Sequence, residues 1–184
     1  MSHQNPQALL VIDVQQAIDT YSDQERNNPD AELRIAALLA KWRALKHPVF
    51  HIRHASKSKE SPYHRSNQFA FKDAVAPIEG EAIVTKSENC AFLGTTLEAD
   101  LRSAGIQELV VCGVLTNNSV DATVRVASGL GFTVTLVSDA TAAFGIKALN
   151  SQFYTADDVH WLFLSNLNDE YCTVVVTDEV LSSL

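Results

Sequence analysis

Residue types that can do acid–base or nucleophilic chemistry follow short apolar runs at five places in the sequence. In chain order these residues are Asp13, Arg53, His54, Lys86, Ser119 and Asp139. If the apolar runs are parallel strands, these side chains gather at the carboxyl edge of one sheet, which is where open α/β sheets bind their ligands. We take them as candidate site residues, and the order of the strands decides which of them converge.

Ser119 lies in the most informative stretch of the chain, VVCGVLTNNSVDATV at Val110–Val124. The pattern predicts a buried strand, a tight turn at Gly113 and the start of a helix. Unpaired backbone N–H groups and the positive end of a helix dipole meet at such a junction, which suits an anion or a developing oxyanion. Ser119 could therefore be a nucleophile or a hydrogen-bond donor to substrate, although serine near a helix start is most often a cap.

Asp13 and Lys86 each have two interpretations. Asp13 could be a general acid or base, or it could cap the following segment or pair with a lysine. Lys86 could stabilise negative charge or orient a carboxylate, whereas a lysine taken alone is more often a solvated surface residue. Position in the sequence leaves both alternatives open.

Cysteine and histidine patterns predict no metal ion and no nucleotide cofactor. The odd number of widely spaced cysteines, without a CxxC pair, indicates buried packing residues in a protein with reduced thiols. They are Cys90, Cys112 and Cys172. His51, His54 and His64 form no recognisable metal signature with a neighbouring carboxylate. No GxGxxG follows the first apolar run, and GxxxxGK(S/T) does not occur.

The 184 residues, 46% of them hydrophobic and 20% charged, are typical of one globular domain that spans residues 1–184. A formal net charge of −8 argues against nucleic acid or an anionic membrane as the main partner and leaves room for a small-molecule substrate. The N-terminal MSHQNPQ lacks the basic and apolar regions of a secretory signal, and no apolar run approaches a membrane span. We expect a cytoplasmic protein.

Six short, continuous apolar runs predict the strands of a sheet that is buried on both faces. They are Ala8–Ile12, Pro48–Ile52, Ala82–Val84, Leu109–Cys112, Val134–Val137 and Cys172–Val176. Helical patterns occupy most of the intervals, at Asp30–Lys46, Thr95–Ser103, Asn118–Leu130 and Thr155–Leu167. This alternation predicts an α/β layered fold with a mostly parallel sheet.

Local signals predict two helix starts and one long loop. Thr95 with Glu98, and Thr155 with Asp158, have capping-box spacing. The polar, irregular stretch Ala55–Asp73 is longer than most loops of compact domains, so we expect a lid, a binding loop or disorder there.

The helix predicted at Thr155–Leu167 has two apolar stripes. One stripe contains Val159, Leu162, Phe163 and Asn166, and the other contains Trp161, Leu164 and Leu167. One stripe can face the sheet and the other needs a second cover, which predicts a homo-oligomer.

Three motifs, in an order that spans nearly the whole chain, give a strong resemblance to a known family. LLVIDVQQ, VTKSENCAF and VVCGVLTNNSVDATVRVASGLGF resemble the catalytic motifs of the isochorismatase-like hydrolases, also called the cysteine hydrolase superfamily. The later runs VSDATAAF and DVHWLFLSNL are also similar to that family. The resemblance assigns the catalytic aspartate, lysine and nucleophile positions to Asp13, Lys86 and Ser119.

That resemblance implies a three-layer α/β/α fold with six parallel strands, in which the three assigned residues converge. It also implies a cis peptide between Val114 and Leu115, and an oxyanion hole made by the N–H groups of Leu115 and Ser119. Four further residues are expected to contact the substrate, namely Gln15, Arg53, His54 and Phe92.

Ser119 departs from the family pattern, because most members have cysteine at this position. A thiol beside a lysine at a helix N-terminus ionises readily, whereas a serine hydroxyl needs a strong base. Asp13 would be a poor base if Lys86 keeps it ionised. Relatives without the cysteine include true isochorismatases, which hydrolyse a vinyl ether by protonating carbon and adding water. We therefore expect non-covalent hydrolysis of a vinyl ether such as isochorismate, with Asp13 as the general acid.

Three alternatives stay open. Residue 119 could be the nucleophile of an amide hydrolase, although the region of the nicotinamidase metal ligands reads HIRHAS here. The chain could instead be a small-molecule-binding relative that has lost catalysis, and Ser119 could be an engineered replacement of cysteine. A response-regulator-like domain is rejected, because it needs paired acids after the first strand, where this chain has Asp13, Val14 and Gln15.

Overall fold

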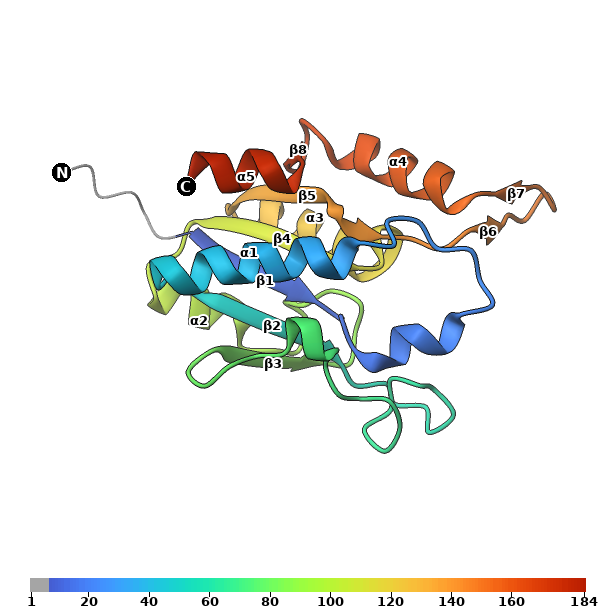
Figure 1. Ribbon diagram of the computed structural model, residues 1–184, viewed down its shortest axis with the longest axis horizontal. Coiled ribbons are helices and arrows are strands. Elements are labelled where there is room, and N and C mark those ends of the chain that lie inside the picture. The colour runs from blue at the N-terminus through green and yellow to red at the C-terminus, as the bar shows by residue number, and fades with distance from the viewer. Residues whose placement is uncertain (1–6) are drawn as a thin grey trace.

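Six parallel strands form the central sheet of the computed structural model, which describes residues 7–184 (Figure 1). In spatial order the strands are β3 (Ala82–Lys86), β2 (Val49–His54), β1 (Gln7–Ile12), β4 (Glu108–Val114), β5 (Thr133–Ala142) and β8 (Thr173–Val175). Each adjacent pair in this order is parallel. The expected six-stranded α/β fold is therefore confirmed.

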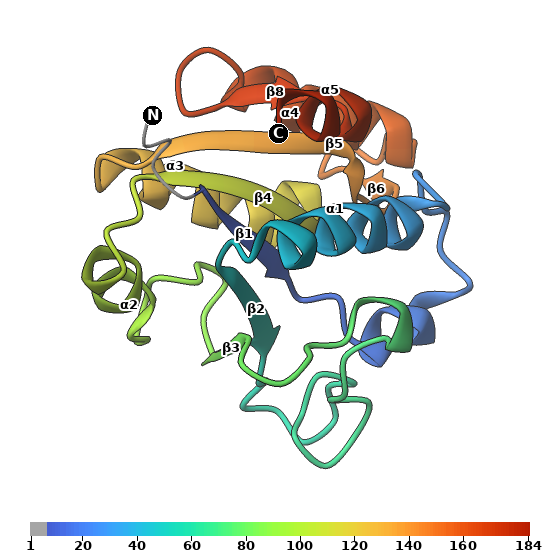
Figure 2. The same cartoon turned by 60° about the vertical axis from the view of Figure 1, so that its left-hand side comes forward.

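Helices cover both faces of this sheet and give the molecule three layers (Figure 1, Figure 2). The side chains of β1 alternate between two apolar clusters, with Leu9 and Val11 in one and Leu10 and Ile12 in the other. The first cluster is closed by α1 (Ala31–Leu45) and α5 (Thr177–Ser183), and the second by α2 (Leu97–Ser103), α3 (Asp121–Gly129) and α4 (Ala156–Leu167). Burial on both faces explains why the strand sequences are continuous apolar runs.

The order of the strands creates a switch point in the middle of the sheet. The chain runs from β1 outward to β2 and β3, and then returns to the other side of β1 to form β4. The connections after β1 and β4 therefore leave the sheet in opposite directions, and ligands of open α/β sheets bind at the carboxyl ends of such strands. The fold therefore predicts a ligand site at the carboxyl ends of β1 and β4.

One of the two predicted capping boxes is present. At α4, Thr155 Oγ1 accepts a bond from the Asp158 amide (3.1 Å) and Asp158 Oδ2 accepts one from the Thr155 amide (3.0 Å), so this box is confirmed. The box predicted at Thr95 is wrong, because α2 begins only at Leu97. The Thr95 hydroxyl donates to the Ala91 carbonyl at 2.6 Å, and its oxygen accepts from the Leu97 amide at 3.3 Å instead of from the Glu98 amide that the box requires.

Short elements that the sequence patterns did not predict complete the fold. They are the 3-10 helices η1 (Gln16–Tyr21) and η2 (Asp73–Val75), the π-helical turn η3 (Thr116–Val120), and the hairpin strands β6 (Ile146–Lys147) and β7 (Phe153–Tyr154). The helix predicted at Asn118–Leu130 accordingly splits into η3 and α3. All three cysteines are free and buried, as expected for packing residues. Within residues 7–184, every helix is too short or too polar to cross a membrane.

Candidate active site

Asp13 is placed at the switch point by the sharp turn that ends β1. Its φ is 55°, a left-handed conformation that aspartate adopts more readily than most residues, and its amide donates to the Ile52 carbonyl of β2 at 2.9 Å. Asp13 is 4% exposed, and its Oδ2 accepts a hydrogen bond from Lys86 Nζ at 2.6 Å. The pairing with a lysine that the sequence allowed is therefore present.

Lys86, at the end of β3, links Asp13, which follows β1, to Ser119, which follows β4. It is the last residue of β3, it is 2% exposed, and its Nζ also donates to Ser119 Oγ at 3.1 Å. The interpretation of Lys86 as a solvated surface lysine is wrong, because its ammonium reaches inward to two acceptors. Such acceptors compensate for the solvation that a buried ammonium loses. Asp13, Lys86 and Ser119 form one connected group.

Ser119 is presented by η3, the turn between β4 and α3. It is buried, and its hydroxyl accepts the bond from Lys86, whereas α3 begins without a side-chain cap among the described residues. The capping interpretation of Ser119 is therefore wrong. The peptide between Val114 and Leu115, which leads into this turn, is cis, as the resemblance implied. Turns of the π type are rare and occur frequently at functional sites.

Gly113 allows β4 to approach β1 at the point where Asp13 begins. Its φ is 118°, and a Cβ added there would lie 2.2 Å from the carbonyl oxygen of Ile12. Only glycine tolerates both the conformation and the contact. The pairing of β4 with β5 also shifts register between Val111 and Gly113. The strand ends that carry Asp13 and Ser119 are thereby held close together.

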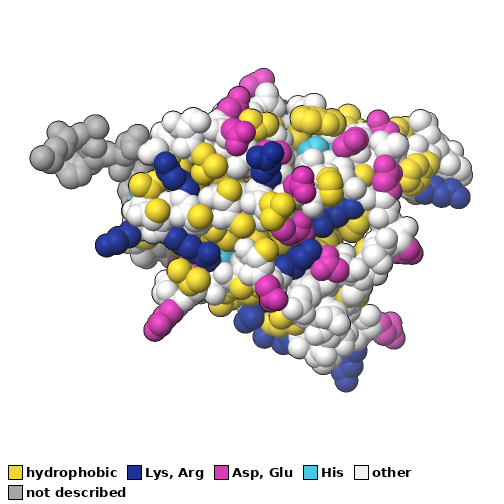
Figure 3. All heavy atoms as spheres, viewed as in Figure 1, with side chains coloured by type: hydrophobic (Ala, Val, Ile, Leu, Met, Phe, Trp, Pro, Cys, Tyr) yellow, Lys and Arg dark blue, Asp and Glu magenta, His cyan; other side chains and the backbone are white. Residues whose placement is uncertain are grey.

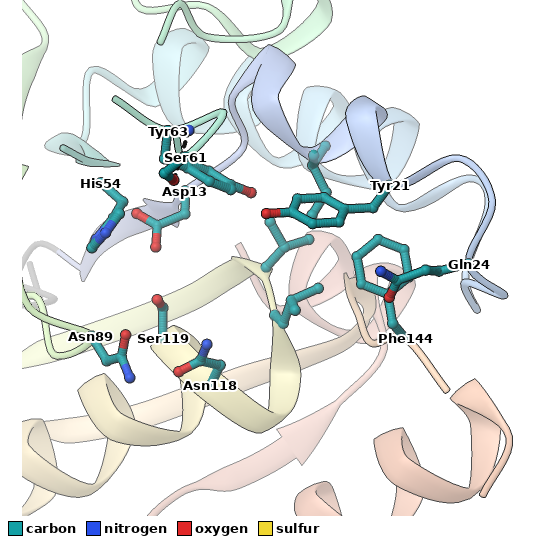
Figure 4. Close-up of a pocket in the computed structure, with 13 residues that line it drawn as sticks. Asp13, Tyr21, Gln24, His54, Ser61, Tyr63, Asn89, Asn118, Ser119 and Phe144 are labelled. Carbon is teal, nitrogen blue, oxygen red and sulfur yellow. Dashed lines mark hydrogen bonds between the residues drawn. The ribbon is translucent and has the colours of Figure 1, made fainter. Parts of the chain in front are cut away.

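A cavity of about 320 Å³ opens at this edge of the sheet, a size suited to a small molecule (Figure 4). Asp13 and Ser119 lie on its wall, together with Ile18, Tyr21, Gln24, His54, Ser61, Tyr63, Asn89, Val114, Leu115, Asn118 and Phe144. Ser61 and Tyr63 come from the stretch Ala55–Asp73, so this segment contributes to the wall, as expected of a binding loop.

Burial governs the ionisation of Asp13. Desolvation raises the pKa of its carboxyl, and the charge and hydrogen bond of Lys86 oppose that rise without cancelling it. The expectation that Lys86 keeps Asp13 ionised stays a prediction, because the pKa of Asp13 is raised only relative to that of an ordinary aspartate. Asp13 Oδ1 is buried and has no hydrogen-bond partner among the described residues. Asp13 thus offers an oxygen that can carry a proton at higher pH than an ordinary aspartate.

His54 is a second titratable side chain on the cavity wall. Burial, assisted by the charge of Lys86, lowers its pKa and favours the neutral imidazole near pH 7. Its ring lies edge-on to that of Tyr63, with 5.9 Å between the ring centroids. Burial also raises the pKa of the Tyr63 phenol. Both side chains are therefore uncharged hydrogen-bonding groups at neutral pH.

Gln15 was expected to contact substrate, but it is not among the described residues that line the cavity. It is fully buried, and its Nε2 donates to the carbonyls of His54 (3.2 Å) and Phe69 (2.9 Å). Its Oε1 accepts a bond from the His54 amide at 2.7 Å. Gln15 therefore links the end of β2 to the Ala55–Asp73 loop through hydrogen bonds.

Arg53 likewise lies off the described cavity wall, because successive residues of a strand point to opposite faces. His54 faces the cavity, whereas the Arg53 guanidinium stacks 4.6 Å from the ring centroid of Phe69, and its Nε donates to Thr85 Oγ1 at 2.9 Å. The substrate contact expected of Arg53 is therefore not supported by its position.

Phe92 and Asp139 lie away from the described cavity wall and contact other parts of the fold. Phe92 is a core residue whose ring stacks on that of Phe132, with centroids 5.9 Å apart. Asp139 lies within β5 instead of after it, and its Oδ1 accepts bonds from the Thr177 amide (2.8 Å) and hydroxyl (2.7 Å) at the start of α5. Neither residue is among those described on the cavity wall.

Several wall residues were not singled out from the sequence. Asn89 and Asn118 had a usable signal, since each lies within three positions of a residue of the connected group. Tyr21 and Phe144 had no signal in the sequence, because only folding brings their two ring centroids within 5.9 Å of each other. Within residues 7–184, no three His, Cys, Asp or Glu side chains are arranged to hold a metal ion.

A connected aspartate, lysine and serine beside a cavity, at the switch point of a six-stranded parallel sheet, defines a class of α/β proteins with a small-molecule site. Residues 7–178 match the Isochorismatase domain, and the chain belongs to the isochorismatase family.

Relatives resemble this chain along most of its length. The isochorismatase family protein YrdC of Bacillus subtilis (strain 168) is 40% identical over 176 residues, covering 95% of this chain and 94% of that protein. An isochorismatase-family crystal structure from Chromobacterium violaceum ATCC 12472 is 45% identical, has a TM-score of 0.95, and is matched over 100% of this chain and 95% of that chain. A streptothricin hydrolase of Streptomyces noursei is 36% identical over 144 residues, covering 77% of this chain and 51% of that protein.

Proposed function

We propose that this protein, acting as one domain, hydrolyses a small molecule by cleaving a vinyl ether, the bond type found in isochorismate. No covalent enzyme intermediate forms. The observation that supports this proposal is the Asp13 carboxyl, which is buried at the cavity, has a raised pKa and has a free Oδ1. Acid-catalysed hydrolysis of a vinyl ether requires such a protonated group.

In the proposed reaction, Asp13 donates its proton to the terminal vinyl carbon, which leaves positive charge on the ether carbon beside the new carboxylate. Water adds to that carbon and returns a proton to Asp13. The hemiketal then breaks its C–O bond and releases an alcohol and a ketone, with the proton count unchanged. Lys86 holds the second oxygen of Asp13, and the N–H groups of Leu115 and Ser119 bind a substrate oxygen.

Amide hydrolysis through Ser119 is the second candidate, and one contact favours it. Ser119 Oγ lies 3.1 Å from Lys86 Nζ, and serine–lysine pairs act as nucleophile and base in other hydrolases. The relative named streptothricin hydrolase also indicates that family members act on substrates other than isochorismate. Against this candidate, Lys86 donates its hydrogen bond to Ser119, whereas a base would have to accept the serine proton.

Turnover assays on the unaltered protein and on Ser119→Cys test the proposal. The substrates are isochorismate, its uncharged dimethyl ester and a panel of small amides. We expect both proteins to hydrolyse a vinyl ether, because the thiol is not required, and only Ser119→Cys to hydrolyse amides. Amide turnover by the unaltered protein without vinyl-ether turnover would contradict the proposal. Absence of turnover on every substrate would favour a protein that binds a small molecule without catalysis.

A further inference from the structure

The cavity wall combines neutral polar groups with an end that carries two aromatic rings. Apart from Asp13 and His54, its polar side chains are amides and hydroxyls, those of Tyr21, Gln24, Ser61, Tyr63, Asn89, Asn118 and Ser119. In Figure 4 the two asparagines and Ser119 lie on the side of Asp13 and His54, whereas Tyr21 and Phe144, together with Gln24, lie at the opposite end. The reacting groups therefore occupy a polar end, and an aromatic surface lies away from them.

Three cationic side chains near this cavity contact other groups of the protein. Lys86 Nζ donates to Asp13 Oδ2 and Ser119 Oγ, and the residue is 2% exposed and is not among the described wall residues. Arg26 holds Glu32 through two bonds, of 2.9 and 3.0 Å, and Arg53 stacks on Phe69. The described wall itself contains neither lysine nor arginine. An anion that left water for this wall would lose its hydration without gaining a direct ion pair with a lysine or arginine of the described wall.

We infer that the site takes an uncharged small molecule with a polar reacting end and a flat apolar ring. The reacting end lies among Asn89, Asn118 and Ser119, whose amides and hydroxyl can donate to and accept from a neutral carbonyl or ether. The ring lies against the aromatic surface of Tyr21 and Phe144. The inference rests on the proposed function in one respect, that this cavity is the substrate site. It narrows that function to an uncharged vinyl ether, in place of the doubly anionic isochorismate.

Binding of benzamide and benzoate tests the charge directly, because the two molecules share a ring and nearly a shape and differ by one charge. Titration calorimetry on the unaltered protein at neutral pH should give benzamide a dissociation constant at least about tenfold below that of benzoate. Equal or tighter binding of benzoate would overturn the inference. Failure to detect benzamide binding at millimolar concentration would overturn it as well.

Matched variants test each end of the cavity. Asn89→Arg adds a cation at an exposed wall residue and should bind benzoate at least about tenfold more tightly than the unaltered protein does. Phe144→Leu should weaken benzamide binding, whereas Phe153→Leu, at a 58% exposed residue outside the described wall, should leave it unchanged. Unchanged benzoate affinity in Asn89→Arg, or equal effects of the two phenylalanine changes, would contradict the inference. If Phe144→Leu does not fold, the benzamide–benzoate comparison still decides.

Binding and turnover separate this inference from the proposed function. Preferential binding of benzamide, without hydrolysis of any vinyl ether, would reject the proposed function and leave the inference standing. Hydrolysis of isochorismate with a lower KM than that of its dimethyl ester would support the proposed chemistry and overturn the inference.

Discussion

At the scale of single residues, the two carboxyl oxygens of Asp13 have different surroundings. Oδ2 is held by Lys86 at 2.6 Å, whereas Oδ1 has no partner within the described part of the chain. A carboxyl that is fixed on one side and open on the other is oriented for proton transfer to a bound molecule. The Ser119 hydroxyl is already engaged by Lys86, so its contribution to the proposed reaction is a hydrogen bond.

Asp13→Asn is expected to lower kcat by about 10²–10⁴-fold, because the amide cannot supply the acid proton. Ser119→Ala removes one hydrogen bond, worth roughly 1 kcal/mol, and should cost less than a factor of ten. Steady-state kinetics on whichever substrate is hydrolysed measures both changes. Equal and severe losses would contradict the non-covalent mechanism, since the parts of one nucleophilic unit fail together.

The raised pKa of Asp13 also predicts the sign of the pH dependence. A general acid must be protonated, so kcat should fall as pH rises through the pKa of Asp13, with a midpoint above the ordinary value of about 4. A carboxylate acting as a base would give the opposite slope. Measurement of kcat against pH distinguishes the two, and Ser119→Ala should move the midpoint upward, because the Ser119 side chain lowers the pKa of Asp13. A rise of kcat through this range would show that Asp13 works as a base.

At the scale of elements, the site depends on the close approach of β1 and β4. Gly113→Ala is expected to destabilise the protein by more than about 2 kcal/mol, because the new Cβ would meet the Ile12 carbonyl oxygen at 2.2 Å and the φ of 118° disfavours a side chain. Urea unfolding measures the change, and an insoluble variant would agree with the prediction.

Gly129→Ala is the matched control for this substitution. A Cβ at Gly129, the last residue of α3, meets nothing within 4 Å, so stability should stay the same or rise by up to about 1 kcal/mol. Equal stabilities of the two variants would contradict the prediction, because they would show that β4 and β1 are farther apart at Gly113 than they are in the structure.

At the scale of the whole molecule, charge gives little reason to expect a polyanionic partner. The net charge is −8, and acidic and basic side chains are interspersed over the face seen in Figure 3. A polyanion binds to a concentrated basic surface, and the mixture of signs on this face does not provide one.

The apolar surface of α4 differs in detail from the two stripes predicted for it. Val159, Leu164 and Leu167 are buried together, although the sequence assigned them to different stripes. Trp161 and Leu162 are 57% and 66% exposed on the same helix. The helix therefore has one buried face and an adjacent exposed apolar pair, which still needs a cover.

We expect a second copy of the chain to cover this exposed pair. Light scattering after size exclusion should give a mass above the 20.1 kDa of one chain. Replacing Trp161 and Leu162 with glutamate should yield a monomer. Leu33→Glu, at a residue that is also 66% exposed but lies on α1, should leave the mass unchanged. A monomeric mass of the unaltered protein at micromolar concentration would contradict the expectation.

A strand that is buried on both faces is apolar at every position, so it can be recognised in the sequence without any long-range information. This is why the fold class could be predicted. Each strand of the main sheet overlaps a continuous apolar run, and the capping box at Thr155 located the start of α4. Asp13, Lys86 and Ser119 were found for a similar reason, since each ends or follows a strand within a motif that resembles a known family.

The sequence by itself therefore determined the class of fold and the three central residues. Only the tertiary structure decided which side chains face the cavity and how strongly the site is desolvated. Arg53 and His54 are adjacent in sequence, yet strand alternation turns them to opposite faces of β2. The raised pKa of Asp13 depends on burial by distant segments, which outweighs the nearby charge of Lys86. Burial and long-range contacts arise only when the chain is packed. No local sequence pattern therefore predicts which residues line the cavity.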